Sequence, residues 1–367
     1  MKEDIKLYIK NLPGWSTRRK IVVFISDDWG DHRIRNEEDY RNLIRIGIPV
    51  DKSIHTRYGN LADKSDLHSL YEVLSGVKDK NGRHAVITPF VILANPDFDK
   101  IRSDGFERYH YELFTDTIRK YENGYQTIKA WEEGIEAGIF VPELHGREHF
   151  NVTQWLHFLS KGDDRLLQAF DLHYAFLKTP GMKVNPVYAF YFDNQTDFEF
   201  LKESLSDGVR LFREIFKRNP LVFNPPNGMF HEAFYSQLAE LGIKAVNAKH
   251  FRMQPDGKGK IVRRYFRFGQ VSYEGITHFI SNCAFEPAGE SYSGIGKALK
   301  QVEIAFRCRK PALINTHRVN FIGSRDIRVR DKSLSEFSLL LSNIQRKWPD
   351  IEFLSAGEFV TLLNKEV

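Results

Sequence analysis

The stretch KIVVFISDDWG (residues 20–30) carries the strongest fold signal in the sequence. Lys20–Ser26 is a continuous apolar run, which is typical of a β-strand buried on both faces in a parallel sheet. Asp27 and Asp28 follow it directly, and two adjacent carboxylates repel each other unless a cation or a neutral partner lies between them. We therefore predict a buried strand that ends in a cation site.

Similar apolar runs recur along the chain and alternate with amphipathic helical patterns. The other predicted strands are residues 85–93, 139–144, 187–192, 221–224, 244–247, 277–281, 312–316 and 351–354. The predicted helices are residues 66–74, 153–159, 197–216, 231–241, 295–307, 333–346 and 358–363. Strands that alternate with helices indicate parallel βαβ units and an α/β fold. Their number favours a distorted (β/α) barrel of about seven strands over an open sheet.

No linker rich in serine or glycine divides the 367 residues, so we expect a single domain over residues 1–367. We expect an insertion around residues 95–135 and a C-terminal helical extension around residues 331–367.

Composition excludes several classes of protein. The two cysteines, Cys283 and Cys308, are too few for a disulfide framework or a cysteine-based zinc site. The net charge is +5, but the basic residues are scattered, so we expect no nucleic-acid partner. The sequence contains no apolar run long enough to span a membrane and no visible secretion signal, so we expect a cytoplasmic protein.

Polar residues with catalytic chemistry follow several predicted strands. Asp27-Asp28, His145, Asn224 and His317 all come at or just beyond strand ends, and in α/β barrels that edge forms the active site. His149 completes a His-x-x-x-His pair with His145. One carboxylate and two imidazoles can hold a Zn²⁺-like ion and leave a position open, while a second carboxylate can accept a proton.

A second Asp-Asp pair shows that the two aspartates alone do not indicate a site. Asp163-Asp164 follows a polar stretch and predicts only a turn or a helix start. The strand before Asp27-Asp28 is therefore what makes that pair a candidate site.

Four motifs together resemble the polysaccharide deacetylase family (NodB-homology, carbohydrate esterase family 4). They are Ser26-Asp27-Asp28-Trp29, the segment His145–His149, the proline-containing segment Phe223–Gly228, and Leu313–His317. They occur in the family's order and span most of the chain. The resemblance implies a distorted barrel of the polysaccharide deacetylase type.

The resemblance also implies a role for each residue. The divalent metal, expected to be Zn²⁺, would be bound by Asp28, His145 and His149. Asp27 would be the general base, His317 the general acid, and the backbone N–H of Asn227 an oxyanion donor. Candidates for substrate binding are Trp29, Asn224, Pro226 and Arg318.

The expected function is metal-dependent hydrolysis of a linear amide, the acetamide of an N-acetylated sugar or glycan precursor, with water activated by the metal as nucleophile. The chain departs from the family at Asn224, where an arginine is usual, and at Asn227, where an aromatic residue is usual. The segment between the two metal motifs is also longer than usual. Two alternatives stay open: an amidohydrolase acting on a non-sugar amide, and a catalytically inactive glycan-binding homologue.

Overall fold

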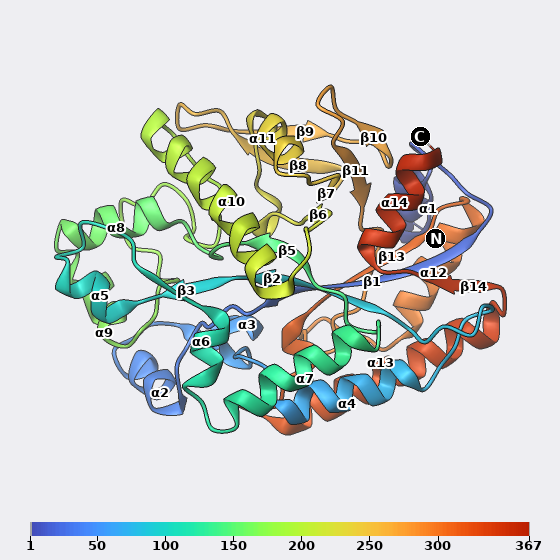
Figure 1. The fold of residues 1–367 in the computed structure, drawn as a ribbon, viewed down its shortest axis with the longest axis horizontal. Coiled ribbons are helices and arrows are strands. Elements are labelled where there is room, and N and C mark those ends of the chain that lie inside the picture. The colour runs from blue at the N-terminus through green and yellow to red at the C-terminus, as the bar shows by residue number, and fades with distance from the viewer. Residues whose placement is uncertain (1, 367) are drawn as a thin grey trace.

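A mainly parallel sheet curls into a distorted barrel and is surrounded by helices (Figure 1). The computed structural model describes residues 2–366. The strands lie side by side in the order β10-β11-β7-β6-β5-β2-β1-β13-β12, with β14 paired to β1. Their bounds are β1 Lys20–Trp29, β2 Ile87–Ile92, β5 Glu143–Gly146, β6 Val222–Phe223, β7 Ala245–Ala248, β10 Gln270–Val271, β11 Thr277–Ile280, β12 Cys283–Ala284, β13 Ala312–His317 and β14 Ile351–Phe353.

One segment closes the barrel. β11 pairs with β7, and after Ser281 and Asn282 the chain continues as β12, which pairs with β13. The side chain of Asn282 donates to Pro311 O and accepts from Leu313 N, so it ties this segment to the start of β13. If β11 and β12 are counted as one strand, β1, β2, β5, β6, β7, β11–β12 and β13 make a ring of seven parallel strands within the described residues. The predicted α/β fold with a distorted barrel is confirmed.

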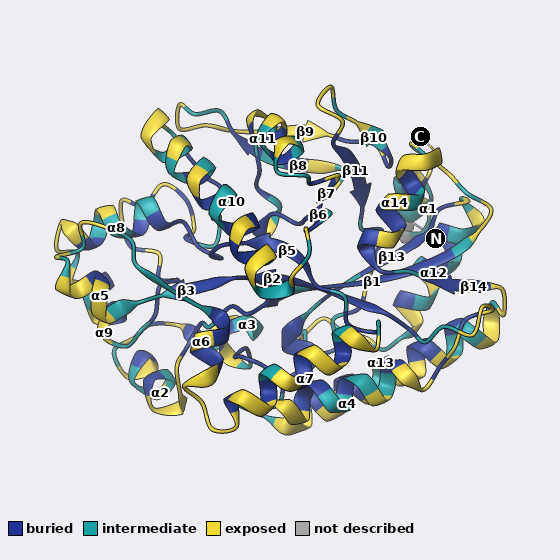
Figure 2. Ribbon diagram, in the orientation of Figure 1, coloured by how far each residue is buried: buried dark blue, intermediate teal, exposed yellow. Residues whose placement is uncertain are grey.

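The helices form the outer layers. Their bounds are α1 Lys2–Asn11, α2 Glu37–Arg45, η1 Val50–Lys52, α3 Ile54–Arg57, α4 Lys64–Ser75, α5 Phe98–Ser103, α6 Phe114–Arg119, α7 Gly124–Glu136, α8 Val152–Ser160, α9 Asp164–Asp171, α10 Gln195–Phe216, η2 Pro226–Gly228, η3 Glu232–Phe234, α11 Tyr235–Glu240, α12 Gly296–Arg307, η4 Arg318–Asn320, α13 Ile327–Lys347 and α14 Ala356–Glu366. Two hairpins flank the barrel, β3 Ala94–Pro96 with β4 Tyr111–Leu113 and β8 Phe251–Pro255 with β9 Ile261–Tyr265. Figure 2 shows buried strands inside and helices whose outer faces are exposed. Within residues 2–366, no helix is both long and apolar enough to cross a membrane.

The two faces of β1 bury different sets of side chains. Ile21, Val23 and Ile25 point into the barrel and join a cluster that α14 covers from the N-terminal end of the strands. The alternate residues Val22 and Phe24 pack outward, and the Phe24 ring meets Phe337 of α13 edge to face. The alternation of successive side chains between the faces of a strand explains the continuous apolar run in the sequence.

Most predicted elements are present, but one predicted strand is wrong. Residues 187–192 form turns and irregular backbone, although Phe190, Tyr191 and Phe192 are buried and Tyr188 is half-buried, as expected for core. The region around 95–135 contains the β3–β4 hairpin with α5, α6 and α7. The C-terminal region after residue 331 contributes β14 to the sheet and α14 to the barrel core, in addition to α13.

Segments outside the barrel build a separate hydrophobic cluster. It joins α2, α5, α8 and α9 through buried residues such as Leu43, Ile101, Trp155 and Phe170. Among the members is Phe176, which also lines the cavity described next. This cluster supports one wall of the site.

Candidate active site

The barrel interior changes from apolar to polar at the C-terminal ends of the strands. In β1, Asp27 follows Ile21, Val23 and Ile25 in the inward-facing series. The same change runs from Val222 to Asn224, from Ala245 to Asn247, from Phe279 to Ser281, and from Leu313 to Asn315 and His317. Period-two alternation therefore carries the polar side chains to one opening of the barrel.

A bulge in β1 brings the second aspartate to the same opening. The pairing of β1 with β2 shifts register between Ser26 and Trp29, and Asp28 has a φ of 71°. Regular alternation would turn Asp28 outward, as it turns Ser26, whereas the extra residue of a bulge re-aims the side chain. Because of this bulge, Asp27 and Asp28 both face the cavity, and Trp29 faces outward.

Asp28, His145 and His149 lie close enough to share one metal ion. Asp28 Oδ1 is 2.9 Å from His149 Nε2 and 3.5 Å from His145 Nε2. All three residues are buried. The structure thus brings the three predicted metal ligands together on β1 and at the end of β5.

The hydrogen bonding of His145 indicates that a cation fits this site. His145 Nδ1 lies 2.6 Å from Asn224 O, which can only accept, so Nδ1 carries the proton in this arrangement. Nε2 then faces the Asp28 carboxylate at 3.5 Å, and this buried nitrogen has no hydrogen-bond partner among the described residues. A backbone carbonyl that fixes the ring tautomer in this way is common for metal-ligating histidines.

The other carboxylate oxygen of Asp28 meets two further side chains. Asp28 Oδ2 accepts from Arg33 at 3.0 Å and lies 3.3 Å from His55 Nδ1. Arg33 also bonds Asp31 at 2.6 Å, and its guanidinium lies over the Phe176 ring. Burial would raise the pKa of Asp28, but Arg33 and the histidines outweigh it and hold that pKa well below its usual range. Asp28 is therefore ionised, as a metal ligand must be.

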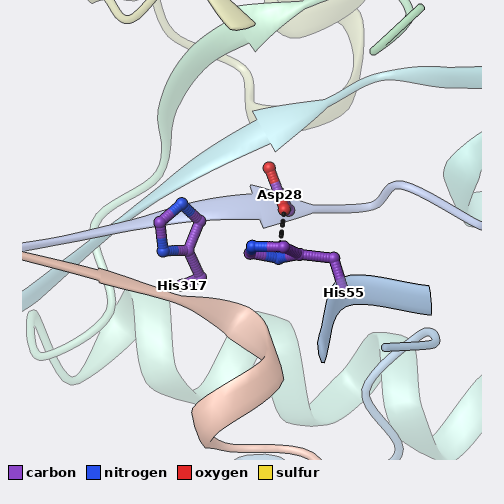
Figure 3. A group of neighbouring side chains, drawn as sticks. All are labelled: Asp28, His55 and His317. Atoms are coloured by element: carbon purple, nitrogen blue, oxygen red, sulfur yellow. Dashed lines mark ion pairs between the residues drawn. The ribbon is translucent and has the colours of Figure 1, made fainter. Parts of the chain in front are cut away.

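His55 comes from α3, and its ring lies next to the Asp28 carboxylate and beside the His317 ring (Figure 3). Its ring centroid is 4.8 Å from that of His317 in an edge-to-face arrangement. Asp28, His55 and His317 form a second group whose ligand atoms lie within 4.8 Å of one another. The site thus holds a histidine that was not among the sequence candidates.

Asp27 is oriented by a row of amide side chains. Asn224 Nδ2 donates to Asp27 Oδ1 at 2.6 Å, Asn247 Nδ2 donates to Asn224 Oδ1 at 3.2 Å, and Ser281 Oγ donates to Asn247 Oδ1 at 3.1 Å. Burial raises the pKa of Asp27, against the opposing effect of His145 and His317. A neutral amide at position 224 fixes the carboxylate without the pKa depression that an arginine would produce.

His317 forms a pair with Glu286. Nδ1 lies 2.5 Å from Glu286 Oε1, and Asn320 donates to the other oxygen of Glu286 at 2.8 Å. Burial alone would lower the pKa of His317, but Glu286 outweighs it and raises that pKa to about 10. Nε2 lies 4.0 Å from Asp27 Oδ2. The protonated ring therefore stands next to the carboxylate that is the candidate base.

These groups line a cavity of about 1260 Å³. Its polar lining includes Asn185, Asn224, Asn227, Asn247 and Asn315, and its aromatic lining includes Tyr174 and Phe176. Asn227 has a left-handed backbone with a φ of 51°, and its side chain donates to Val187 O at 3.0 Å. The cavity exceeds the roughly 300–1,000 Å³ of usual small-ligand sites.

Three substrate-binding candidates lie away from this cavity. Trp29 is only 1% exposed, donates to Ser26 Oγ and packs on Trp131 and Phe140, because the bulge turns it toward the helices. Arg318 is buried and donates to Asp31 O at 2.5 Å. Pro226 is buried, and the cavity touches Pro225 in its place. We therefore correct the candidate set: of these residues, only Asn224 faces the cavity.

The sequence offered little signal for the residues that it missed. His55 lies in a four-residue helix within a long connection, and Arg33 has no distinctive spacing to Asp28. Glu286 follows β12, so its position beyond a strand was the only available indication.

Sequence comparison gives no relative, whereas structure comparison gives several. No family model and no curated protein matches the sequence. A structure from Mycobacterium smegmatis assigned to the polysaccharide deacetylases is 11% identical, with 96% of this chain and 94% of that chain covered and a TM-score of 0.45. One from Pseudomonas aeruginosa PAO1 with the same assignment is 8% identical, with 95% and 92% covered and a TM-score of 0.49. PuuE allantoinase is 9% identical, with 95% and 91% covered and a TM-score of 0.45. At such distances the function has to be inferred from this chain's own site.

Proposed function

We propose that the protein is a metal-dependent deacetylase that hydrolyses the acetamide group of an N-acetylated sugar or glycan precursor. The observation that carries the proposal is the combination on one cavity wall of Asp28, His145 and His149 with a separate carboxylate, Asp27, and a protonated imidazole, His317. Each group that amide hydrolysis needs is then supplied by a different side chain.

The ligand set suits a divalent ion, with Zn²⁺ the expected one. Two neutral imidazoles and one carboxylate are a set that catalytic zinc sites use. A divalent ion bound there would polarise the amide carbonyl and lower the pKa of water.

Asp27 is the proposed general base. Asn224 holds one of its oxygens at 2.6 Å, which leaves the other free to take a proton from the attacking water. Because burial raises its pKa, this carboxylate holds a proton more strongly than an exposed aspartate does. Asn224 therefore takes over the orienting part of the role that an arginine has in the family.

His317 is the proposed general acid. Glu286 fixes its Nδ1, so Nε2 is the atom that donates to the leaving amine. Asn227, on η2, lines the cavity, and its backbone N–H is the proposed donor to the developing oxyanion.

The remainder of the cavity favours a sugar substrate. Six asparagine residues line it, and amide groups can donate to and accept from sugar hydroxyls. Tyr174 and Phe176 add apolar surface for ring faces. A cavity of about 1260 Å³ is also larger than a small amide such as allantoin requires.

Acetate release from the Zn²⁺-loaded protein tests the proposal. A panel of mono- and oligosaccharides with N-acetyl groups is compared with allantoin and acetamide. We expect acetate from at least one sugar and no turnover of the small amides. Turnover of small amides alone would identify a non-sugar amidohydrolase, and sugar binding without acetate release would identify an inactive homologue. Asp164→Asn, at the exposed member of the second Asp-Asp pair, is the matched control and should behave like the wild type.

A further inference from the structure

The N-terminal helix forms one wall of the cavity. Lys6, Ile9, Lys10 and Pro13 line it, at a spacing that places them on one side of α1 and its end. Asn11 accepts from Asn282 at 2.8 Å, which anchors the helix to the segment that closes the barrel. The wall is therefore attached to the barrel itself.

Two lysines from different segments, Lys10 and Lys249, line this part of the cavity. Lys10 Nζ donates to Ser281 O at 3.1 Å, and Lys249, in the loop after β7, is close enough to repel it electrostatically. Burial and this repulsion lower the pKa of Lys10. Neither ammonium group forms an ion pair with any described carboxylate. Two uncompensated cations of this kind attract an anion.

The charges around the whole cavity also favour the binding of an anion by these lysines. Its carboxylates are Asp27 and Asp28, both of which have partners described above. Its cations are Lys6, Lys10, Arg33, Lys52, Lys249 and the protonated His317, which is paired with Glu286. Arg33 is paired with two aspartates, and Lys52 lies 3.1 Å from Asp51. The lysines of α1 and the β7 loop are left to face a ligand.

The lysine pair is connected to the reaction centre. Ser281 contacts Lys10 through its backbone carbonyl and Asn247 through its hydroxyl, and Asn247 reaches Asp27 through Asn224. An anion held by the lysines would thus be near a sugar whose acetamide lies at Asp27.

We propose that Lys10 and Lys249 bind a phosphate group of the substrate, so that the preferred substrate is a phosphorylated N-acetyl sugar. The identity of the sugar rests on the proposed deacetylase function, whereas the phosphate site stands independently of it. Lysine binds phosphate as a compact point charge with rotatable donors, and no planar arginine fork faces this wall.

The cavity mouth suggests two sources of such a phosphate. Phe251 and Tyr265 of the β8–β9 hairpin are both exposed, line the cavity and pack on each other with ring centroids 5.2 Å apart. Exposed aromatic faces can stack on the base of a sugar nucleotide. A simple sugar phosphate would bind the lysines alone.

Calorimetric binding in the metal-loaded Asp27→Asn background tests the phosphate site without turnover. The probes are N-acetylglucosamine, its 1-phosphate, and UDP-N-acetylglucosamine. We expect the phosphorylated probes to bind more tightly than the neutral sugar. Lys10→Met and Lys249→Met should each weaken that binding about tenfold. Lys258→Met, at the exposed tip of the hairpin, should leave it unchanged.

The variants distinguish failure of the phosphate site from failure of the deacetylase function. Equal affinity for neutral and phosphorylated sugars, or phosphate binding that ignores both lysine substitutions, would overturn the proposal. Because Lys249 is exposed, its replacement does not threaten folding, and it keeps the test valid if Lys10→Met unfolds. A loss in Phe251→Ala for the nucleotide probe alone would identify the nucleotide as the source. Lysine-dependent phosphate binding without any acetate release would support this site and contradict the deacetylase.

Discussion

The two halves of the barrel interior show how one strand pattern serves two purposes. In the half nearer the strand N-termini, inward positions such as Ile21, Val23 and Leu313 pack under α14. In the other half, inward positions further along the same strands are Asp27 and His317. The backbone pattern is common to both halves, and only the side-chain chemistry differs.

This difference shows that the polar side chains of the site are positioned by the sheet and stabilised by polar partners. Buried apolar side chains stabilise a fold without needing particular partners, whereas a buried charge needs a compensating one. At the opening, Arg33 compensates the charge of Asp28 and Glu286 that of His317, whereas Asp27 accepts a hydrogen bond from the neutral Asn224. Substitutions in the two halves should therefore have separable consequences.

Removing the charge of Asp27 should have the largest effect on activity. Asp27→Asn should reduce kcat by about 10²- to 10⁴-fold, the usual contribution of general acid–base catalysis, because the amide cannot accept the proton. Metal content and the unfolding midpoint should stay near those of the wild type. Steady-state acetate release with elemental analysis checks both, and undiminished turnover would eliminate Asp27 as the base.

Truncating a side chain in the apolar half should lower the stability of the fold and leave metal binding unchanged. Ile21→Ala removes a fully buried side chain from the cluster under α14 and should lower the free energy of unfolding by about 2–5 kcal/mol. Urea unfolding measures this loss, and the folded variant should still bind one metal ion. If Ile21→Ala lost metal while remaining folded, the two halves would not be independent.

The Glu286–His317 pair should be visible in the pH dependence. Glu286 raises the pKa of His317 to about 10, so the acid form persists at neutral pH and is lost only as the pH rises through that value. Glu286→Gln removes the cause, and the pKa of His317 should fall toward the ordinary value of about 6.5. The alkaline limb of the kcat profile should then move to lower pH. A limb that does not move would exclude His317 as the acid.

The sequence predicted the strands and the strand-end chemistry because both follow local patterns. The run before Asp27 fixes a buried strand, and parallel strands meet at one edge, which brings His145 and His317 to Asp28. The order of the motifs then supplied the family resemblance.

The features that the sequence did not predict are those that depend on tertiary packing. Trp29 points outward only because of the bulge at Asp28, and no local sequence pattern predicts this bulge. His55 and Lys10 reach the cavity from a short helix and from the N-terminal helix, whose positions depend on long-range contacts. Phe190 and Phe192 are buried without forming a strand, because burial does not require a sheet.

Metal content of the purified protein tests the central claim most directly. Elemental analysis after Zn²⁺ loading and dialysis should find about one ion per chain in the wild type. The same result is expected for His157→Ala, an exposed histidine on α8. His145→Ala and Asp28→Ala should lose most of that ion, with far-UV circular dichroism showing that both remain folded. Full metal content in either folded variant would contradict the site.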